Sequence, residues 1–203
     1  MIKGFYINLD KRPDRKIHFE GLKTKYPFFN GVERFSAIPH EKGFVGCCKS
    51  HVEVLKKCRE LEGDVFMVCE DDLQIYNEVN FKKMTETLDL NADWDVLTLT
   101  PRGDSIKGQD LPNGYIRVQN NQTATCYVLK RHMLDILIDT LEEGYRQLEL
   151  GGHPNDHTND QIWKKLQTTY KFYYYKDVFA GQLVGFSDIE KRFVNYNDRF
   201  MKQ

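Results

Sequence analysis

The nonapeptide DVFMVCEDD, residues 64–72, indicates the fold class more clearly than any other part of this sequence. Its residues Asp64 to Cys69 form a compact, mostly apolar run that starts just after Gly63. A run of that length and composition is typical of a buried strand. Three carboxylates follow at once, so we expect the strand to end in a polar turn.

Segments of strand and helix character alternate before this run. Pro13 suits the first turn of a helix, and apolar residues from Val45 to Leu55 recur at the spacings of three and four that mark an amphipathic helix. The pattern predicts strands over Lys3 to Leu9 and Glu33 to Ile38, and helices from Pro13 to about Lys25 and over Gly43 to Glu60.

The alternation continues after the acidic turn. It predicts helices over Asn77 to Leu88 and Arg131 to Glu143, a helix that begins at the capping-box pattern Thr158 to Gln161, and β-rich segments over Trp94 to Leu99, Tyr115 to Val118, Thr123 to Leu129, Tyr170 to Tyr175 and Val178 to Leu183. The tail after Ile189 has no clear period. Such alternation predicts a Rossmann-like α/β sandwich, with a mostly parallel central sheet flanked by helices. The length suits a single domain over residues 1–203.

Bulk composition excludes several classes of protein. Charged residues make up 29% of the chain, but the formal net charge is only -1, which argues against a protein that coats nucleic acid. The five cysteines are odd in number and contain no Cys-x-x-Cys pair, so neither a disulfide framework nor a four-ligand zinc site is indicated. The N-terminus does not resemble a signal peptide, and no apolar run approaches the ~18–20 residues of a membrane span. We therefore expect a cytoplasmic protein with no integral membrane segment and no nucleic-acid partner.

The acidic turn is the first candidate site. Three adjacent carboxylates repel one another and need a cation or exposure to water. Side chains two apart in an extended chain share a face, so Glu70 and Asp72 would project together, with Asp71 turned away or used in the turn. Two convergent carboxylates suit Mg²⁺ or Mn²⁺ bound to a diphosphate. The alternative is a solvated acidic turn, although parallel sheets bind ligands beyond the carboxyl ends of their strands, where this turn is predicted.

A basic turn follows the first predicted strand. Asn8, Asp10, Arg12 and Arg15 surround the start of the first helix. A helix N-terminus suits phosphate, and arginine adds bidentate donors. The alternative is an ordinary surface helix start, with Asp10 near the cap and both arginines in water.

The helix predicted over Gly43 to Glu60 carries a second group. Gly46 would let the backbone approach a ligand closely, and Ser50 and His51 could bond a nucleotide or line a sugar pocket. The alternative is a packed glycine and a buried histidine with a structural partner. The segment lacks the Lys-Ser/Thr of a P-loop.

A polar stretch precedes the late helix and contains His153, Asp156, His157 and Asp160. Pro154 and the capping pattern predict that this stretch is not yet helical, so the two histidines are not taken as a metal pair on one helix face. Asp160 would be the second helical residue. It is either a carboxylate that interacts with the helix dipole or a general base that takes a proton from an acceptor hydroxyl.

Together these segments resemble glycosyltransferase family 25, the group that contains lipooligosaccharide galactosyltransferases and collagen β-galactosyltransferases. The resemblance spans nearly the whole chain and depends on the order and spacing of its pieces. The matching pieces are Ile7-Asn8-Leu9-Asp10-x-Arg12-Pro13-x-Arg15, Arg34-Phe35-x-Ala37-Ile38, Gly46-x-x-x-Ser50-His51, Glu70-Asp71-Asp72, Trp94-Asp95-Val96-Leu97, Thr125-x-Tyr127-Val128-Leu129, Asp160-Gln161 and Ser187-Asp188-Ile189.

The resemblance implies a GT-A fold and inverting transfer of a hexose, most often galactose, from a UDP-sugar to a hydroxyl of a glycan or protein acceptor, with Mn²⁺ or Mg²⁺ as cofactor. The residues assigned on this basis are the metal ligands Glu70 and Asp72, the catalytic base Asp160 with Asp156 as second choice, and the donor-binding residues Asn8, Asp10, Arg12, Arg15, Gly46, Ser50, His51, Asp71, Ser187 and Asp188. Two other functions stay open. One is a non-catalytic sugar-nucleotide or glycan-binding module, since a fold does not determine a function. The other is a metal-dependent phosphohydrolase.

Overall fold

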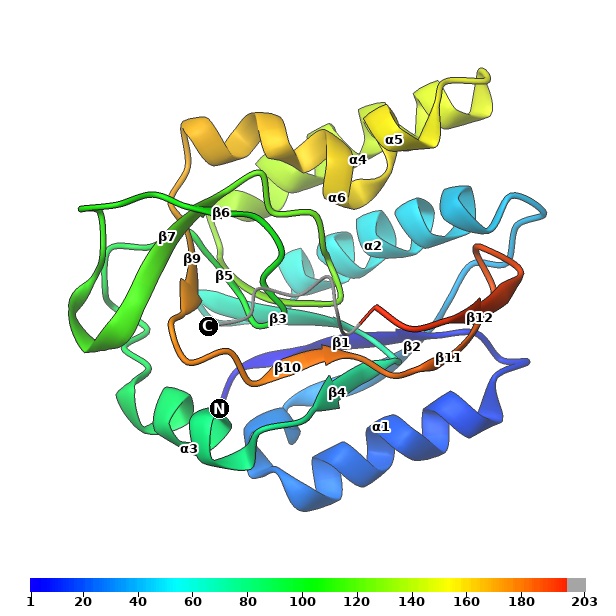
Figure 1. The fold of residues 1–203 in the computed structure, drawn as a ribbon. Coiled ribbons are helices and arrows are strands. Elements are labelled where there is room, and N and C mark those ends of the chain that lie inside the picture. Colours follow the sequence, from blue (N-terminus) through cyan, green and yellow to red (C-terminus); the bar gives the residue numbers. More distant parts are fainter. Residues whose placement is uncertain (197–203) are drawn as a thin grey trace.

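A central sheet with helices on both faces organises the chain, and the computed structural model describes residues 1–196 of it (Figure 1). The sheet has the strand order β2-β1-β3-β8-β5-β9-β7-β6. Its strands are β1 (Lys3–Asn8), β2 (Val32–Ser36), β3 (Val65–Glu70), β5 (Val96–Thr98), β6 (Asp104–Ser105), β7 (Tyr115–Gln119), β8 (Cys126–Lys130) and β9 (Phe172–Tyr175).

Strand pairing in this sheet is mixed. The strand β1 is parallel to both of its neighbours, β2 and β3, and β5 is parallel to β9. The strand β8 lies between β3 and β5 and is antiparallel to both, and β7 is antiparallel to β9 and β6. The predicted α/β class is confirmed. Parallel pairing predominates on the β2-β1-β3 side, and the antiparallel strands lie towards the other edge.

Helices cover both faces of the sheet (Figure 1). The helices α2 (Gly43–Glu60), α4 (Met133–Glu149), α5 (Pro154–His157) and α6 (Asn159–Ile162), with the 3₁₀ helix η3 (Trp163–Thr168), lie over one face. The helices α1 (Pro13–Lys25) and α3 (Glu78–Thr87), with the 3₁₀ helix η1 (Pro27–Phe29), lie over the other. Each face has its own buried apolar cluster, one against α2 and α4 and one against α1 and α3.

The long helix α4 extends six residues beyond its predicted end at Glu143. Gly144 lies within it, where a Cβ atom would be 2.5 Å from the carbonyl oxygen of His157, so the glycine lets α4 pack closely against α5. Within residues 1–196, no helix is both long enough and apolar enough to cross a membrane.

The segment before α6 differs from its prediction. It was expected to be non-helical, but residues 154–157 form the single turn α5, with Pro154 at a first-turn position that needs no N–H donor. Thr158 is the N-cap of α6, as predicted, but it makes no side-chain cap. Its hydroxyl donates to the Pro154 carbonyl at 2.9 Å and to Asp160 Oδ1 at 3.0 Å instead.

Two small sheets complete the described part of the chain. The strands β4 (Leu73–Ile75) and β10 (Ala180–Gln182) pair beside the acidic turn. The strands β11 (Gly185–Ser187) and β12 (Arg192–Val194) form a hairpin, and only β12 lies in the tail after Ile189, where the sequence shows no period. A further 3₁₀ turn, η2 (Pro112–Gly114), precedes β7.

Gly4→Ala is expected to destabilise the protein strongly. Gly4 lies in β1 between β2 and β3, and a Cβ atom there would be 1.8 Å from the carbonyl oxygen of Met67. We expect a loss of about 3 kcal/mol or more in the free energy of unfolding, because packed backbone has to move apart. Chemical denaturation would measure it.

Gly21→Ala is the matched control for this test. Gly21 lies in α1 and a Cβ atom there meets nothing within 4 Å. Alanine should stabilise a helix by up to about 1 kcal/mol at such a position. Equal stability of the two variants would contradict the packing described for β1.

Candidate active site

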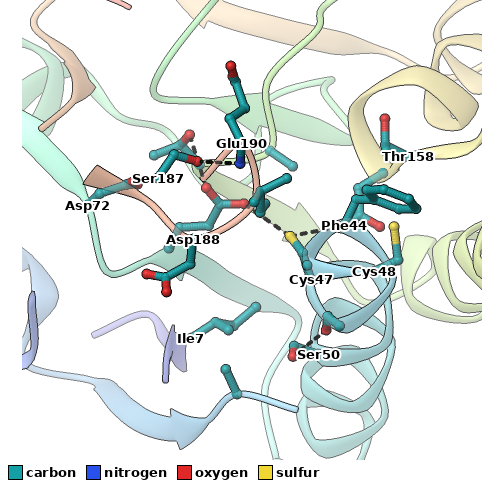
Figure 2. Close-up of a pocket in the computed structure, with 18 of the residues that line it drawn as sticks. Ile7, Phe44, Cys47, Cys48, Ser50, Asp72, Thr158, Ser187, Asp188 and Glu190 are labelled. Atoms are coloured by element: carbon teal, nitrogen blue, oxygen red, sulfur yellow. Dashed lines mark hydrogen bonds between the residues drawn. The ribbon is translucent and has the colours of Figure 1, made fainter. Parts of the chain in front are cut away.

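A cavity of about 650 Å³ opens at the carboxyl ends of β1 and β3. Its walls come from the start of α1, the first turns of α2, the segment before β8, α6 and the β11–β12 hairpin. Figure 2 shows Cys47 and Ser50 on α2 at one side of this space, and Asp72, Ser187 and Asp188 at the other. The antiparallel strand β8 contributes because its beginning lies beside the end of β3, where the Glu70 N–H donates to the Thr125 carbonyl at 2.6 Å.

The three carboxylates of the acidic turn all line the cavity, and their partners differ except that Asp71 and Asp72 share Arg15. Glu70, the last residue of β3, faces α2, with Oε1 3.3 Å from His51 Nε2. Asp71 turns towards β1 and accepts from Asn8 Nδ2 at 2.7 Å. Asp72 accepts from Arg15 at 3.0 Å through Oδ2.

The pKa values of these three carboxyl groups are shifted in different directions. It raises the pKa of Asp72 to about 7, and the charge of Glu70 adds to this shift. Burial also raises the pKa of Asp71, against the hydrogen bond from Asn8 and the charge of Arg15. Burial would raise the pKa of Glu70 too, but the hydrogen bond and charge of His51 outweigh it and lower that pKa. Clustered, buried carboxyl groups of this kind favour a bound cation.

The acidic turn has a donor suited to a divalent metal. Asp72 Oδ1 is buried and has no hydrogen-bond partner among residues 1–196. Asp72 lines the cavity, and a carboxylate oxygen is the ligand type that Mg²⁺ and Mn²⁺ prefer. The residues present therefore fit such an ion, with Asp72 as a direct ligand and Glu70 beside it.

The basic turn lines the cavity in part. Arg15 bonds Asp71 and Asp72, and Arg12 bonds Asp14 and, at 2.6 Å, Asp188. Both guanidinium groups also donate to the carbonyl oxygen of Phe186 in β11. These bonds tie the start of α1 to the acidic turn and to the hairpin.

Three residues predicted to bind the donor, Asn8, Asp10 and His51, lie outside this lining. Asn8 is buried and joins Asp71 to Arg34, whose Nε donates to Asn8 Oδ1 at 2.8 Å. Asp10 is exposed and pairs with the same arginine. Asn8 therefore supports the acidic turn through its hydrogen bond to Asp71, and Asp10 faces solvent.

The predicted group on α2 holds one wall together. Ser50 Oγ donates to the Gly46 carbonyl at 2.7 Å and accepts from the Ile38 N–H at 2.8 Å. A Cβ atom on Gly46 would lie 2.6 Å from the Ile38 carbonyl oxygen, so glycine allows the loop after β2 to pack on α2. His51 is fully buried, between Glu70 and Tyr127.

The two candidate bases have different positions. Asp160, on α6, lines the cavity. Burial raises its pKa, the hydroxyl of Thr158 opposes the shift, and the charge of Glu70 adds to it. Asp156, on α5, is exposed and lies outside the cavity lining.

The predicted motif Ser187-Asp188-Ile189 contributes to the rim of the cavity. Ser187 and Asp188 both line the cavity. Asp188 pairs with Lys11 at 2.7 Å and with Arg12, which binds the hairpin to the start of α1. Sequence reasoning missed other lining residues, including Lys11, Cys47, Arg102, Gln122, Thr125 and Gln182. Apart from Cys47 in α2, they lie in loops and strand ends from separate parts of the chain, and no local pattern marks them as residues that line a cavity.

Comparisons with known proteins identify the class of this fold. Neither a protein-family model nor a curated protein matches the sequence. The chain is similar to the crystal structure of a glycosyltransferase involved in the glycosylation of the major capsid of PBCV-1, with a TM-score of 0.59 and 11% identity over 94% of this chain and 96% of that one. It is more distantly similar to mannose-1-phosphate geranyltransferase from Thermus thermophilus, with a TM-score of 0.40 and 8% identity over 86% of this chain and 59% of that one. The first likeness confirms that the chain has a GT-A-like fold.

Proposed function

We propose that this chain is a metal-dependent, inverting glycosyltransferase that transfers a hexose, galactose in the first instance, from a UDP-sugar to a hydroxyl of a glycan or protein. One observation carries the proposal. An acidic turn, two arginines and a separate half-buried carboxylate, Asp160, line a single cavity at the carboxyl ends of β1 and β3. The cavity volume of about 650 Å³ is within the range of small-molecule sites.

The diphosphate of the donor would lie between α1 and the acidic turn. Arg12 and Arg15 provide bidentate donors beside the N-terminus of α1, which favours anions. Arg12 is paired with Asp188, and Arg15 is paired with Asp72. A bound diphosphate would therefore replace these carboxylates as the partner of the two arginines. Glu70 and Asp72 would hold Mn²⁺ or Mg²⁺, which when bound neutralises charge on the departing diphosphate.

The acceptor hydroxyl would lie beside Asp160. A carboxylate with a raised pKa is a stronger base than one with an ordinary pKa, and it must be within hydrogen-bond reach of the proton that it takes. Asp160 would accept the hydroxyl proton as the oxygen attacks the anomeric carbon on the face opposite the diphosphate. Asp156 is the weaker candidate because it lies outside the cavity lining.

The motif order described above supports a place in glycosyltransferase family 25, and we propose that residues 1–203 form one catalytic domain of that kind. The GT-A-like fold is compatible with this assignment.

A screen of UDP-sugars with and without Mn²⁺ tests the proposed function. We expect Mn²⁺-dependent binding of one UDP-sugar by isothermal titration calorimetry, together with slow hydrolysis of that donor and faster turnover when an acceptor is added. Binding without turnover on any acceptor would favour a binding module. Phosphate release from simple phosphoesters, with no preference for UDP, would favour a phosphohydrolase.

A further inference from the structure

Three side chains of different chemistry meet where α2 approaches the end of β3. Cys47 and His51 are four residues apart in α2 and so share one face of the helix. Glu70 Oε1 lies 3.3 Å from His51 Nε2 and 3.7 Å from Cys47 Sγ. The three ligand atoms all lie within 4.8 Å of one another, and within residues 1–196 no other group of three His, Cys, Asp or Glu side chains comes this close.

The two separations from Glu70 Oε1 match the edges of a zinc tetrahedron. With Zn–S near 2.3 Å and Zn–N and Zn–O near 2.0–2.1 Å, ligand atoms stand roughly 3.3–3.6 Å apart. We propose that Cys47, His51 and Glu70 bind a zinc ion, with the fourth position open to the cavity. This inference goes beyond the proposed transferase and does not depend on it.

Asn159 supplies an independent observation at the same place. This side chain is only 4% exposed, and its Nδ2 donates to Cys47 Sγ at 3.7 Å. Its Oδ1 is buried and has no partner among the residues that the structure describes, which is unfavourable for a polar atom. Turning the amide over would present Oδ1 to the ligand group, as a fourth ligand or as an acceptor for a zinc-bound water.

The outer contacts suit ligands of this kind. Imidazole ligands usually donate their other ring nitrogen to a fixed partner, and His51 Nδ1 lies 3.2 Å from the hydroxyl of Tyr127. The hydroxyl of Thr125 donates to Glu70 Oε2 at 3.5 Å, which orients the carboxylate. On binding, the Cys47 thiol would release its proton to solvent, and the thiolate sulfur would form the bond to zinc.

The chemical types of the three ligands favour one metal over others. A thiolate with an imidazole favours zinc over Mn²⁺ or Mg²⁺, which prefer oxygen ligands. The group is thus chemically distinct from the carboxylates at Asp71 and Asp72, although it shares Glu70 with the pair proposed to hold Mn²⁺.

Titration with Co²⁺ tests the zinc site directly, because cobalt replaces zinc and a cobalt–thiolate bond absorbs in the near ultraviolet. We expect the wild-type chain, kept reduced with a non-thiol reductant, to develop this band with one equivalent of Co²⁺ and to lose it when Zn²⁺ is added. Cys47→Ser should abolish the band and weaken zinc binding, measured by competition with a chromogenic chelator, by at least about tenfold.

Cys48→Ala is the matched control. Cys48 is the neighbouring buried thiol on α2 and packs with Val45 and Leu148, outside the ligand group. This variant should keep the band, and circular dichroism should show that both variants are folded. Absence of the band in the wild type, or its persistence in Cys47→Ser, would overturn the proposal. Asp72→Ala should keep the band, so loss of sugar-nucleotide binding in that variant would report on the proposed function alone.

Discussion

Asp72→Ala is expected to abolish metal-dependent binding of a UDP-sugar while leaving the fold intact. The variant removes the buried, unpartnered Oδ1 that fits a divalent metal, and it also removes one partner of Arg15. We expect an affinity at least about 100-fold lower in the presence of Mn²⁺, by isothermal titration calorimetry. The turn should persist, because the Asp72 carbonyl still accepts from the Leu183 N–H and Arg15 still pairs with Asp71.

Asp93→Ala is the control for this variant. Asp93 is exposed and pairs with Lys171, far from the cavity lining. It should bind the donor as the wild type does. An Asp72→Ala protein with wild-type affinity and a wild-type melting curve would remove Asp72 from the proposed metal site.

Asp160→Asn is expected to slow transfer by about 100- to 10,000-fold, the usual contribution of a general base. The amide keeps the size of the carboxylate but cannot take the hydroxyl proton. Donor affinity should be nearly unchanged, because Asp160 lies on α6, whereas the arginines and the acidic turn belong to α1 and the end of β3. Steady-state kinetics with the donor and acceptor found in the UDP-sugar screen would measure both effects.

Asp156→Asn is the matched variant for this prediction. Asp156 precedes Asp160 by four residues, on the separate turn α5, and is exposed and outside the cavity lining. Its rate should equal that of the wild type. If Asp156→Asn loses the activity and Asp160→Asn keeps it, the base has been assigned to the wrong carboxylate.

Local patterns predicted much of the fold. The helices over residues 13–25 and 43–60 have the predicted bounds, because a proline at a helix start and an apolar stripe are signals carried by the segment itself. The antiparallel position of β8 and the short strands β4, β11 and β12 could not be predicted. They depend on pairing between residues distant in sequence, which leaves little trace in a strand of three residues.

The candidate site was predictable to a similar degree. The rule that ligands bind at the carboxyl ends of parallel strands located Arg15 and Asp72 in advance, and both line the cavity. The orientation of Glu70 towards α2 was not predictable, because strand alternation says nothing of the His51 and Cys47 side chains that receive it. Asp10 seemed to belong to the basic turn by sequence proximity, but it pairs with Arg34 at the surface.

The pairing of β4 with β10, which are far apart in sequence, affects how the chain folds during translation. The acidic turn lies well before residue 183 in the chain, yet the Leu183 N–H donates to the Asp72 carbonyl and the β11–β12 hairpin closes the rim of the cavity. The strands β1, β2 and β3 can pair as soon as β3 has been translated, since their contacts lie within residues 3–70. A nascent chain that stops before residue 183 would thus carry the carboxylates proposed to bind metal without the completed cavity, so we expect ligand binding to require translation beyond that residue.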